Sequence, residues 1–349
     1  MLPLRGKNAS PSFREHLGHK KQFFMNRPIC YIYRPLQRQK TIKLEAMTKH
    51  FSRRQFLNTT LGFSALALTN IDDFKKHKPL LSFSTLGCPD WTFDQILSFA
   101  ANNGYSGIEI RGIQRQMDLT KVPEFGKDQL ENTLKRLKEK KLKIVNLGSS
   151  ATMHFSDPAE RSKNMEEGKN FIQLANALNC PYIRVFPNLL PKDKDKNETM
   201  KLIADGLNTL GDYAKDKNVR VLMETHGDLV HIADLQTVMS QANHPNVGLV
   251  WDMVNMWSIT KEPPEEMYAA LKKYIYHTHI KDASFVDGKL RYVFLGKGET
   301  PISKAVQLLR NGGYKGYYSF EWEKLWHPEI EAPELAIADY SKSIKQWMK

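Results

Sequence analysis

Eight short runs rich in β-branched and aromatic residues recur along residues 79–349, and stretches with the periodicity of amphipathic helices separate them. This alternation predicts a parallel sheet with helical crossovers, because parallel strands need a long connection, and eight such units can close a barrel. We therefore expect an α/β protein with the (β/α)8 TIM-barrel fold. The predicted strands are 81–86, 107–111, 143–147, 182–186, 219–224, 247–252, 274–279 and 316–321.

The main alternative is an open doubly wound sheet, but no Gly-x-Gly-x-x-Gly motif follows the first predicted strand. Thr92 is expected to cap the first barrel helix and Gly104 to follow its end. Thr300 and Pro301 are expected to open the last helix of this kind. Residues 296–299 (GKGE) resemble a phosphate-binding loop, but we interpret them as a tight turn into that helix.

The formal net charge of +13 suggests nucleic-acid binding until it is divided along the chain. Residues 1–46 hold 10 Lys and Arg against 2 Asp and Glu, and residues 47–78 hold 6 against 2. Residues 79–349 therefore keep 35 of the 51 basic and 34 of the 38 acidic residues, which is nearly neutral. Because attraction to a phosphate backbone needs clustered excess Lys and Arg, we expect no nucleic-acid partner.

Residues 47–78 have the pattern of a bacterial export signal followed by a linker. Residues 52–57 (SRRQFL) form a twin-arginine motif, and the apolar run after it is short for a membrane span. We expect export to the periplasm, cleavage near residues 65–67, and no stable membrane insertion after the signal is removed. An ordinary surface helix with two arginines is the alternative. Residues 1–46 are expected to be a disordered basic extension, and residues 79–349 the barrel domain.

Four consecutive predicted strands end in an ionisable side chain, namely Glu224, Asp252, His279 and Glu321. The C-terminal ends of all strands in a parallel barrel meet at one face, so these side chains are expected to converge there. Any one of them alone is more simply explained as a helix cap or a surface ion pair. Four at successive strand ends favour one shared site.

A divalent metal ion is the simplest reason for three carboxylates and one imidazole to converge, because without a cation they would repel and be costly to bury. An oxygen-rich set with one nitrogen suits Mn²⁺ best, with Co²⁺, Mg²⁺ and Zn²⁺ as alternatives. Such an ion polarises a carbonyl and acidifies the neighbouring C–H, while a carboxylate on each side moves the proton. Glu224 and Glu321 are the candidates for that acid and base chemistry.

The sequence resembles the xylose-isomerase-like TIM barrels over most of residues 80–345. The most specific similarities are residues 224–227 (ETHG), 251–252 (WD), 279–282 (HIKD) and 320–323 (FEWE). The family includes sugar-phosphate isomerases and epimerases, ketose epimerases, inosose-processing enzymes and endonuclease IV. The resemblance implies that the Glu, Asp, His and Glu in these segments bind the metal and that the two glutamates act as acid and base.

Five further residues are expected near the substrate. His226 and Lys281 lie beside the ligands in sequence, His154 follows the third strand, and Trp322 could offer a face to a sugar ring. Asn255 stands where many members of the family carry a His, which removes a ligand or substrate contact. This departure argues against a nuclease, which in this fold needs a multi-His site and a basic groove.

Other polar positions are assigned structural roles. We expect Glu109 to pair with Arg111 or Lys281, and His277 to be a satisfied core histidine one pleat below the ligand histidine. Asp282 is expected to orient the ligand histidine or to cap the next helix.

The preferred function is a metal-dependent isomerase or epimerase that moves a proton through an enediolate on a non-phosphorylated sugar. The alternative is a metal-dependent lyase or dehydratase on a keto-sugar or 3-keto-glycoside, in which the same enediolate expels a β-substituent. A non-catalytic sugar-binding barrel is a third reading, which the pair of glutamates disfavours. The expected partner is a small sugar. The sequence leaves open the identity of that sugar and whether the chain forms a homo-oligomer.

Overall fold

The computed structural model describes residues 78–348. The expected basic extension and twin-arginine segment lie outside the described residues and stay predictions. Within the described part of the chain, no helix combines the length and apolar character needed to cross a membrane.

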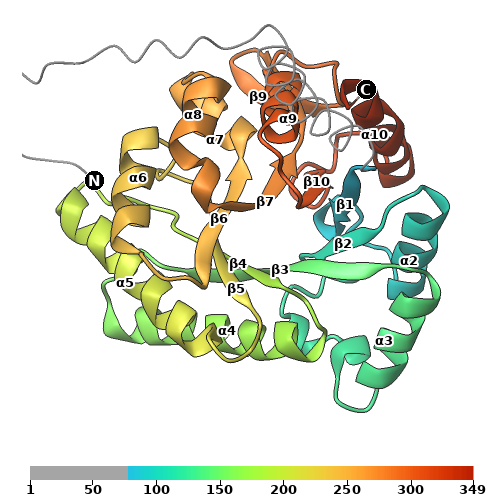
Figure 1. Ribbon diagram of the computed structural model, residues 1–349, viewed down its shortest axis with the longest axis horizontal. Helices are drawn as coiled ribbons and strands as arrows, with labels where there is room; N and C mark the ends of the chain where they lie inside the picture. Colours follow the sequence, from blue (N-terminus) through green and yellow to red (C-terminus); the bar gives the residue numbers. More distant parts are fainter. Residues whose placement is uncertain (1–77, 349) are drawn as a thin grey trace, which may run out of the picture. The chain divides into compact units, whose positions relative to one another are not determined.

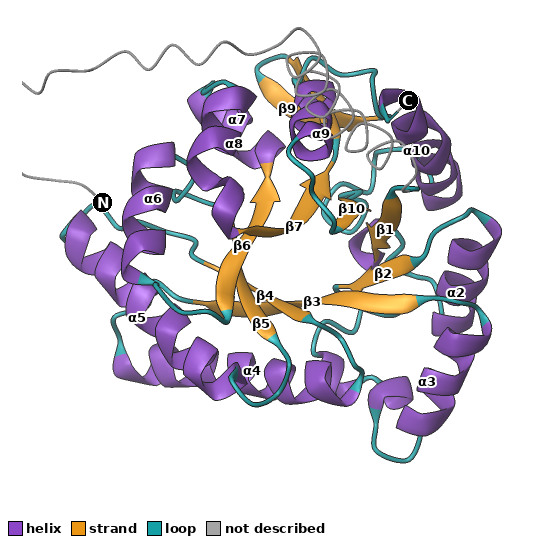
Figure 2. Cartoon of the chain, viewed as in Figure 1, coloured by secondary structure: helices purple, strands orange, loops and turns teal. Residues whose placement is uncertain are grey.

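Eight parallel strands close into a barrel in the order β1-β10-β7-β6-β5-β4-β3-β2, which confirms the predicted TIM barrel. Helices surround the strands (Figures 1 and 2). The barrel strands are β1 (Leu80–Ser84), β2 (Gly107–Ile110), β3 (Lys143–Thr152), β4 (Tyr182–Phe186), β5 (Arg220–Glu224), β6 (Val247–Asp252), β7 (Ile275–Ile280) and β10 (Tyr317–Phe320). The helices are α2 (Phe93–Asn102), α3 (Leu130–Glu139), α4 (Pro158–Ala177), α5 (Lys196–Ala214), α6 (Ile232–Gln241), α7 (Met253–Thr260), α8 (Pro264–Leu271), α9 (Ile302–Asn311) and α10 (Pro333–Trp347).

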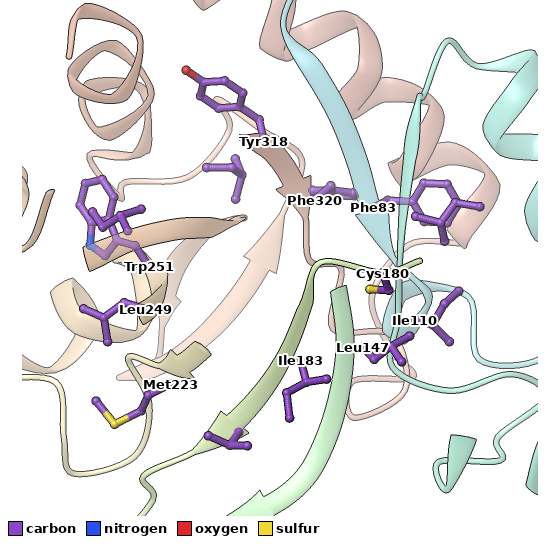
Figure 3. Close-up of a cluster of buried hydrophobic side chains, with 14 of the residues drawn as sticks. Phe83, Ile110, Leu147, Cys180, Ile183, Met223, Leu249, Trp251, Tyr318 and Phe320 are labelled. Carbon is purple, nitrogen blue, oxygen red and sulfur yellow. The ribbon is translucent and has the colours of Figure 1, made fainter. Parts of the chain in front are cut away.

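Strand side chains alternate between an apolar outer layer and a polar interior. Phe83, Ile183 and Trp251 belong to the core between the sheet and the helices (Figure 3). Glu109 on β2 and His277 on β7 contact each other at 2.7 Å although their strands are not neighbours in the sheet. This contact crosses the barrel interior, so the axis of the barrel is polar at the level just below its mouth.

The third strand is the largest departure from the predicted boundaries. It continues to Thr152, five residues beyond the predicted end at Leu147, and its pairing with β4 shifts register between Gly148 and Thr152. Residues 148–152 (GSSAT) are small and mostly polar, so they carry no apolar alternation that would predict a strand. An irregularity of this kind re-aims side chains at the rim of a barrel.

Helix ends follow the expected chemistry at α2 but not at α9. Thr92 and Gln95 form a capping box at the start of α2, and Gly104 has a positive φ of 77° just after its end. The prediction that Thr300 caps α9 is wrong. That helix has Pro301 at its N-cap, and the Thr300 hydroxyl instead donates to Asp282 Oδ1 at 2.6 Å.

The segment after β7 forms a two-stranded hairpin, β8 (Asp282–Val286) and β9 (Lys289–Val293), which was not predicted. The carboxylate of Asp282 accepts hydrogen bonds from the backbone N–H groups of Gly296 at 2.8 Å and Gly298 at 3.0 Å. The protein's own carboxylate thus fills the loop that resembles a phosphate cradle. Asp282 neither orients the ligand histidine nor caps the next helix, so that expectation is wrong.

We predict that Asp282→Ala lowers the free energy of unfolding by roughly 3 kcal/mol, because the N–H groups of Gly296 and Gly298 and the buried hydroxyl of Thr300 lose a shared charged acceptor. Chemical denaturation of the barrel measures this loss. Lys297→Ala, in the same loop but at an exposed position, is the control and should change stability by less than about 0.5 kcal/mol. Equal effects of the two substitutions would contradict the role given to Asp282.

Candidate metal centre and active site

The four predicted ligands meet at the mouth of the barrel. Glu224 ends β5, Asp252 ends β6, His279 lies one residue before the end of β7, and Glu321 follows β10. One ligand atom from each residue lies within 4.8 Å of the others, and all four residues are buried. The shared exit of parallel strands therefore brings together side chains that lie far apart in the sequence.

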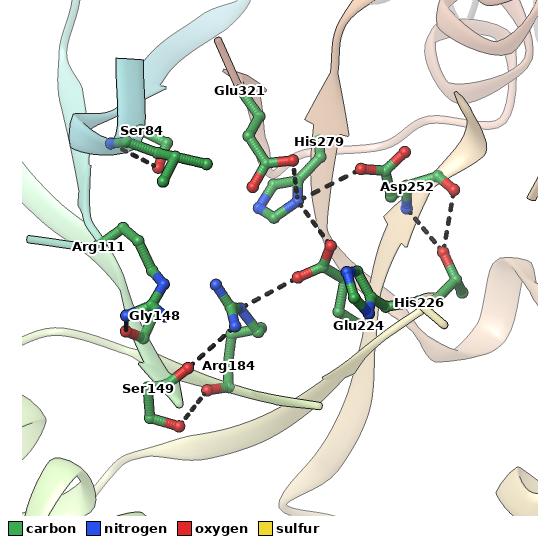
Figure 4. A network of polar contacts seen from close by, with 12 residues as sticks. Ser84, Arg111, Gly148, Ser149, Arg184, Glu224, His226, Asp252, His279 and Glu321 are labelled. Atoms are coloured by element: carbon green, nitrogen blue, oxygen red, sulfur yellow. Dashed lines mark hydrogen bonds and ion pairs between the residues drawn. The ribbon is translucent and has the colours of Figure 1, made fainter. Parts of the chain in front are cut away.

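The imidazole of His279 lies at the centre of this group (Figure 4). Its Nδ1 is 3.2 Å from Glu321 Oε2, 3.5 Å from Glu224 Oε1 and 3.7 Å from Asp252 Oδ2. Its Nε2 is 3.0 Å from Glu109 Oε1 on the opposite edge of the ring. A carboxylate at Nε2 fixes the tautomer with hydrogen on that nitrogen, which leaves Nδ1 as the atom able to bind a metal.

The donor set fits a divalent cation. His279 Nδ1 is buried, makes no hydrogen bond within the described part of the chain, and faces carboxylate oxygens of Glu321, Glu224 and Asp252. The ion pairs of Arg184 and Lys281 supply two positive charges for these three carboxylates, so a cation at Nδ1 would balance the remaining negative charge. Three carboxylates and one imidazole would hold the ion, which supports a divalent metal at this position.

Lys281 supplies a fixed positive charge beside the ligands. Its ammonium lies 2.7 Å from both Asp252 Oδ2 and Glu321 Oε2, and 2.6 Å from Glu323 Oε1. Burial alone would lower the pKa of Lys281, but the charges of Asp252 and Glu321 outweigh it and raise that pKa well above its ordinary value. The structure thus places Lys281 against the ligands, and its expected contact with substrate hydroxyls stays a prediction.

Glu109 has partners different from those expected. It accepts hydrogen bonds at 2.7 Å from His277 and at 3.0 Å from His279, so the predicted pairing with Arg111 or Lys281 is wrong. Burial would raise the pKa of the Glu109 carboxyl, but the charge of His279 and the hydrogen bonds from both imidazoles outweigh it and lower that pKa strongly. His277 is buried, as predicted for a core histidine, and shares this carboxylate.

Two arginines on the β2 to β4 side of the mouth were not predicted as site residues. Arg184 Nε lies 3.1 Å from Glu224 Oε2, and both side chains are buried. Arg111 donates to Gly148 O at 3.3 Å and to Ser150 Oγ at 3.0 Å. A Cβ on Gly148 would lie 2.8 Å from the Arg111 side chain and 3.1 Å from Arg184, so only glycine lets both guanidinium groups approach here.

The remaining predicted substrate residues differ in their contacts with the candidate ligands. Asn255 Nδ2 is 3.3 Å from Glu224 Oε1, and His226 Nδ1 is 3.1 Å from Asn188 Oδ1. His154 is buried and its Nδ1 has no hydrogen-bond partner among the described residues. Trp322 is wrong as a substrate contact, because its ring is fully buried against Phe320 and its Nε1 donates to a backbone carbonyl.

Both glutamates are held as carboxylates. Burial by itself raises the pKa of each carboxyl group, but the charges of Arg184 and His279 outweigh it at Glu224 and lower that pKa. At Glu321 the charges of His279 and Lys281 outweigh burial and hold the pKa well below its ordinary value. Deprotonated carboxylates are the form that binds a cation and accepts a proton.

A closed parallel barrel with a buried set of oxygen and nitrogen ligands at its C-terminal face defines a TIM-barrel protein of the metal-binding class. The family model "Xylose isomerase-like TIM barrel" matches residues 97–347, and the chain belongs to that family.

Three similar proteins are informative. The inosose isomerase of Halalkalibacterium halodurans is 26% identical over 243 residues, covering 67% of this chain and 82% of that protein. The 3-dehydroshikimate dehydratase of Bacillus anthracis is 24% identical over 198 residues, covering 56% and 68%. A crystal structure of an IOLI protein with a zinc atom has a TM-score of 0.65 and 22% identity, covering 77% and 97%. The two sequence relatives are enzymes, and the solved structure shares the fold.

We predict that metal binding releases one proton. In the metal-free protein, burial would lower the pKa of His279, but the charges of Glu321 and Glu109 outweigh it and raise that pKa well above its ordinary value. The ring is then protonated at neutral pH, and a metal must displace that proton, so apparent affinity should rise about tenfold per pH unit between about pH 6 and 8. Calorimetric titration in two buffers of different ionisation enthalpy measures the release. An affinity independent of pH would contradict the assignment of His279 as a ligand.

We predict that Glu109→Gln weakens metal binding by roughly 10- to 100-fold, because an amide retains only one acceptor oxygen for two imidazole N–H groups. Competition with a chromophoric chelator measures the affinity. Ser319→Ala is the matched control, since its hydroxyl donates to Glu109 Oε2 at 3.2 Å without touching a ligand. If both variants bind metal as the wild type does, Glu109 does not position His279.

Proposed function

We propose that the chain is a metal-dependent lyase that removes a proton next to the carbonyl of a cyclic keto-polyol and expels a β-substituent. The observation that carries this proposal is the placement of Glu224 and Glu321 on either side of His279 Nδ1, at 3.5 Å and 3.2 Å. Two carboxylates around one cation site can act on one substrate from two directions.

The two glutamates have different neighbours, which assigns their roles. Glu224 is paired with Arg184, whose guanidinium keeps its proton, so Glu224 is suited to accept the proton from carbon. Glu321 is paired with Lys281, whose ammonium can exchange a proton, so this side is suited to protonate the departing oxygen. When bound, the metal supplies Lewis-acid polarisation of the carbonyl.

The step balances without an oxidant or reductant. The C–H bond next to the carbonyl breaks, and its proton goes to the carboxylate while its electron pair forms the new C=C bond. The bond between the β-carbon and oxygen breaks, and the leaving oxygen takes up a proton to depart as water or an alcohol. The charged environment of the mouth stabilises the negative charge that develops on the carbonyl oxygen.

The similar dehydratase supports elimination over the isomerase reading preferred from the sequence. Isomerisation remains the second candidate, because the similar inosose isomerase matches more of this chain than the similar dehydratase does, and the same proton abstraction begins both reactions. Mn²⁺ is the proposed ion, on the basis of the three carboxylates and one imidazole. A non-phosphorylated substrate is proposed because Asp282 fills the loop that resembles a phosphate site.

We predict turnover of cyclic ketones in D2O with elimination as the outcome. The barrel is loaded in turn with Mn²⁺, Mg²⁺, Co²⁺ or Zn²⁺ and incubated with inosose, 3-dehydroshikimate, methyl 3-keto-β-glucoside or a free ketose, and products are followed by NMR. An unsaturated product supports the lyase. Deuterium incorporation with all oxygens retained supports the isomerase instead. If neither product forms with any of these substrates, both the lyase and the isomerase are rejected for them.

The role of the glutamates is tested in the same assay. Glu224→Gln and Glu321→Gln should each lower kcat by about 100-fold or more, because an amide cannot accept or return the proton. Glu329→Gln is the control, as this exposed residue lies on the segment after the same strand and its carboxylate contacts His327.

A further inference from the structure

The loops that follow β4 and β5 are joined at the mouth of the barrel. The backbone N–H of Asp228, after β5, donates to the backbone carbonyl of Asn188, after β4, at 2.8 Å. Asn188 has a positive φ of 57°, a conformation that asparagine adopts more readily than most residues. A Cβ on Gly227 would clash with the same carbonyl oxygen, so only glycine permits this approach. The backbone of Asn188 is therefore held at a fixed place beside the end of β5.

Two hydrogen bonds orient the side-chain amide of Asn188. The hydroxyl of Thr152, at the end of β3, donates to the carbonyl of Ser150 at 3.1 Å, and its oxygen accepts from Asn188 Nδ2 at 3.3 Å. This turns Asn188 Oδ1 toward His226, whose Nδ1 lies 3.1 Å away. Because an amide oxygen only accepts, the hydrogen of this last bond lies on Nδ1 of the imidazole.

This hydrogen bond sets the chemical character of the other ring nitrogen. A neutral imidazole carries one hydrogen, so a ring with hydrogen on Nδ1 has an unprotonated Nε2 that can only accept. The side chain of His226 is half-buried, and the bond through Nδ1 is the hydrogen bond that its ring makes among the described residues. Nε2 is therefore available to a ligand as a neutral acceptor.

The imidazole of His226 lies beside the candidate base. Its ring packs against Phe186 with ring centroids 4.6 Å apart, and the guanidinium of Arg184 lies 3.7 Å from the centroid of the same phenyl ring. Arg184 is in turn paired with Glu224 at 3.1 Å. Figure 4 shows the imidazole next to Glu224 at the mouth. A polyol bound at the metal centre would thus have this ring as a neighbour.

A neutral acceptor complements the charged groups of the mouth. The guanidinium of Arg184 and the ammonium of Lys281 only donate hydrogen bonds, and the carboxylates of Glu224 and Glu321 are paired with them. A substrate hydroxyl can accept from a cation and at the same time donate to Nε2 of His226. This combination recognises a hydroxyl group and disfavours a hydrogen atom in its place, because Nε2 would then lose its partner.

We propose that Asn188 is a positioning residue that holds His226 with hydrogen on Nδ1, and that Nε2 accepts a hydrogen bond from one hydroxyl group of the substrate. The inference rests on the proposed function and deepens it, since it assigns a specificity contact to the polyol at the metal centre. His226 keeps its hydrogen on Nδ1 throughout, so the proton transfers stay with the two glutamates.

The tautomer is measured by long-range ¹H–¹⁵N correlation NMR on the full chain labelled with ¹⁵N in histidine. The spectrum is recorded at about pH 8.5, where an ordinary imidazole is neutral, and the signals of His226 are identified by their loss in His226→Asn. Asn188→Gly removes the amide and keeps the backbone conformation, while Asn188→Asp keeps an acceptor. The matched control is Asn179→Gly, which also has a positive φ, of 53°, but precedes β4 at the opposite face of the barrel.

We expect hydrogen on Nδ1 of His226 in the wild type, in Asn188→Asp and in Asn179→Gly. In Asn188→Gly the hydrogen should move to Nε2, because a histidine side chain without an acceptor at Nδ1 favours that tautomer. Hydrogen on Nε2 in the wild type, or an unchanged tautomer in Asn188→Gly, overturns the positioning role of Asn188.

The substrate contact is measured with inosose and analogues in which each hydroxyl is replaced in turn by hydrogen. For one analogue, the Mn²⁺-loaded wild type should have a kcat/KM about five- to tenfold below that for inosose, the effect of one lost hydrogen bond. Asn188→Gly should lose this discrimination through a raised KM for inosose, with kcat nearly unchanged. Asn188→Asp and Asn179→Gly should discriminate as the wild type does. The same discrimination in Asn188→Gly as in the wild type, for every analogue, rejects the contact.

A binding measurement separates this proposal from the proposed function. myo-Inositol, which has no carbonyl group, is titrated into the Mg²⁺-loaded full chain, and the ¹⁵N resonance of His226 Nε2 is followed. An upfield shift of this resonance, with Nδ1 still protonated, supports the contact even if no ketone is turned over and the lyase fails. No change at Nε2 with myo-inositol or with any ketone that is turned over rejects the contact, and turnover in that case leaves the lyase standing.

Discussion

The arrangement of the charged groups at the mouth of this barrel depends on one imidazole, which lies between carboxylates on both of its nitrogens. His279 contacts Glu109 through Nε2 and faces three carboxylates through Nδ1, so its two nitrogens have different tasks. The carboxylate at Nε2 comes from β2, across the barrel from β7, and it fixes the ring within the polar interior. Every other feature of the site depends on this orientation, because a ring turned over would present its hydrogen-bonded edge to the metal ligands.

The sequence predicted the barrel and the convergence of the four candidate ligands because both follow from simple periodic rules. Runs of buried strand residues alternate with amphipathic helices, and this alternation leaves few topologies. Parallel strands all exit at one face, so Glu224, Asp252, His279 and Glu321 could be brought together without coordinates. Side chains whose position is determined by the end of a strand are therefore predictable even when their contacts are not.

Contacts across the barrel interior were not predictable by the same rules. The pairing of Glu109 with His277 depends on strand tilt and register, which alternation does not specify. Arg184 was missed although a charged residue within the apolar strand 182–186 was a usable signal for an inward-facing group. Trp322 was misassigned because its position beside Glu321 suggested the mouth, whereas alternation turns adjacent residues to opposite sides, and its ring is buried in the core.

The two cations of the mouth make its two glutamates inequivalent. Arg184 on β4 holds Glu224, and Lys281 after β7 holds Glu321, so charge is balanced from opposite sides. The guanidinium of Arg184 keeps its proton beside Glu224, whereas the ammonium of Lys281 beside Glu321 can exchange one. This asymmetry supports the different roles proposed for the two glutamates.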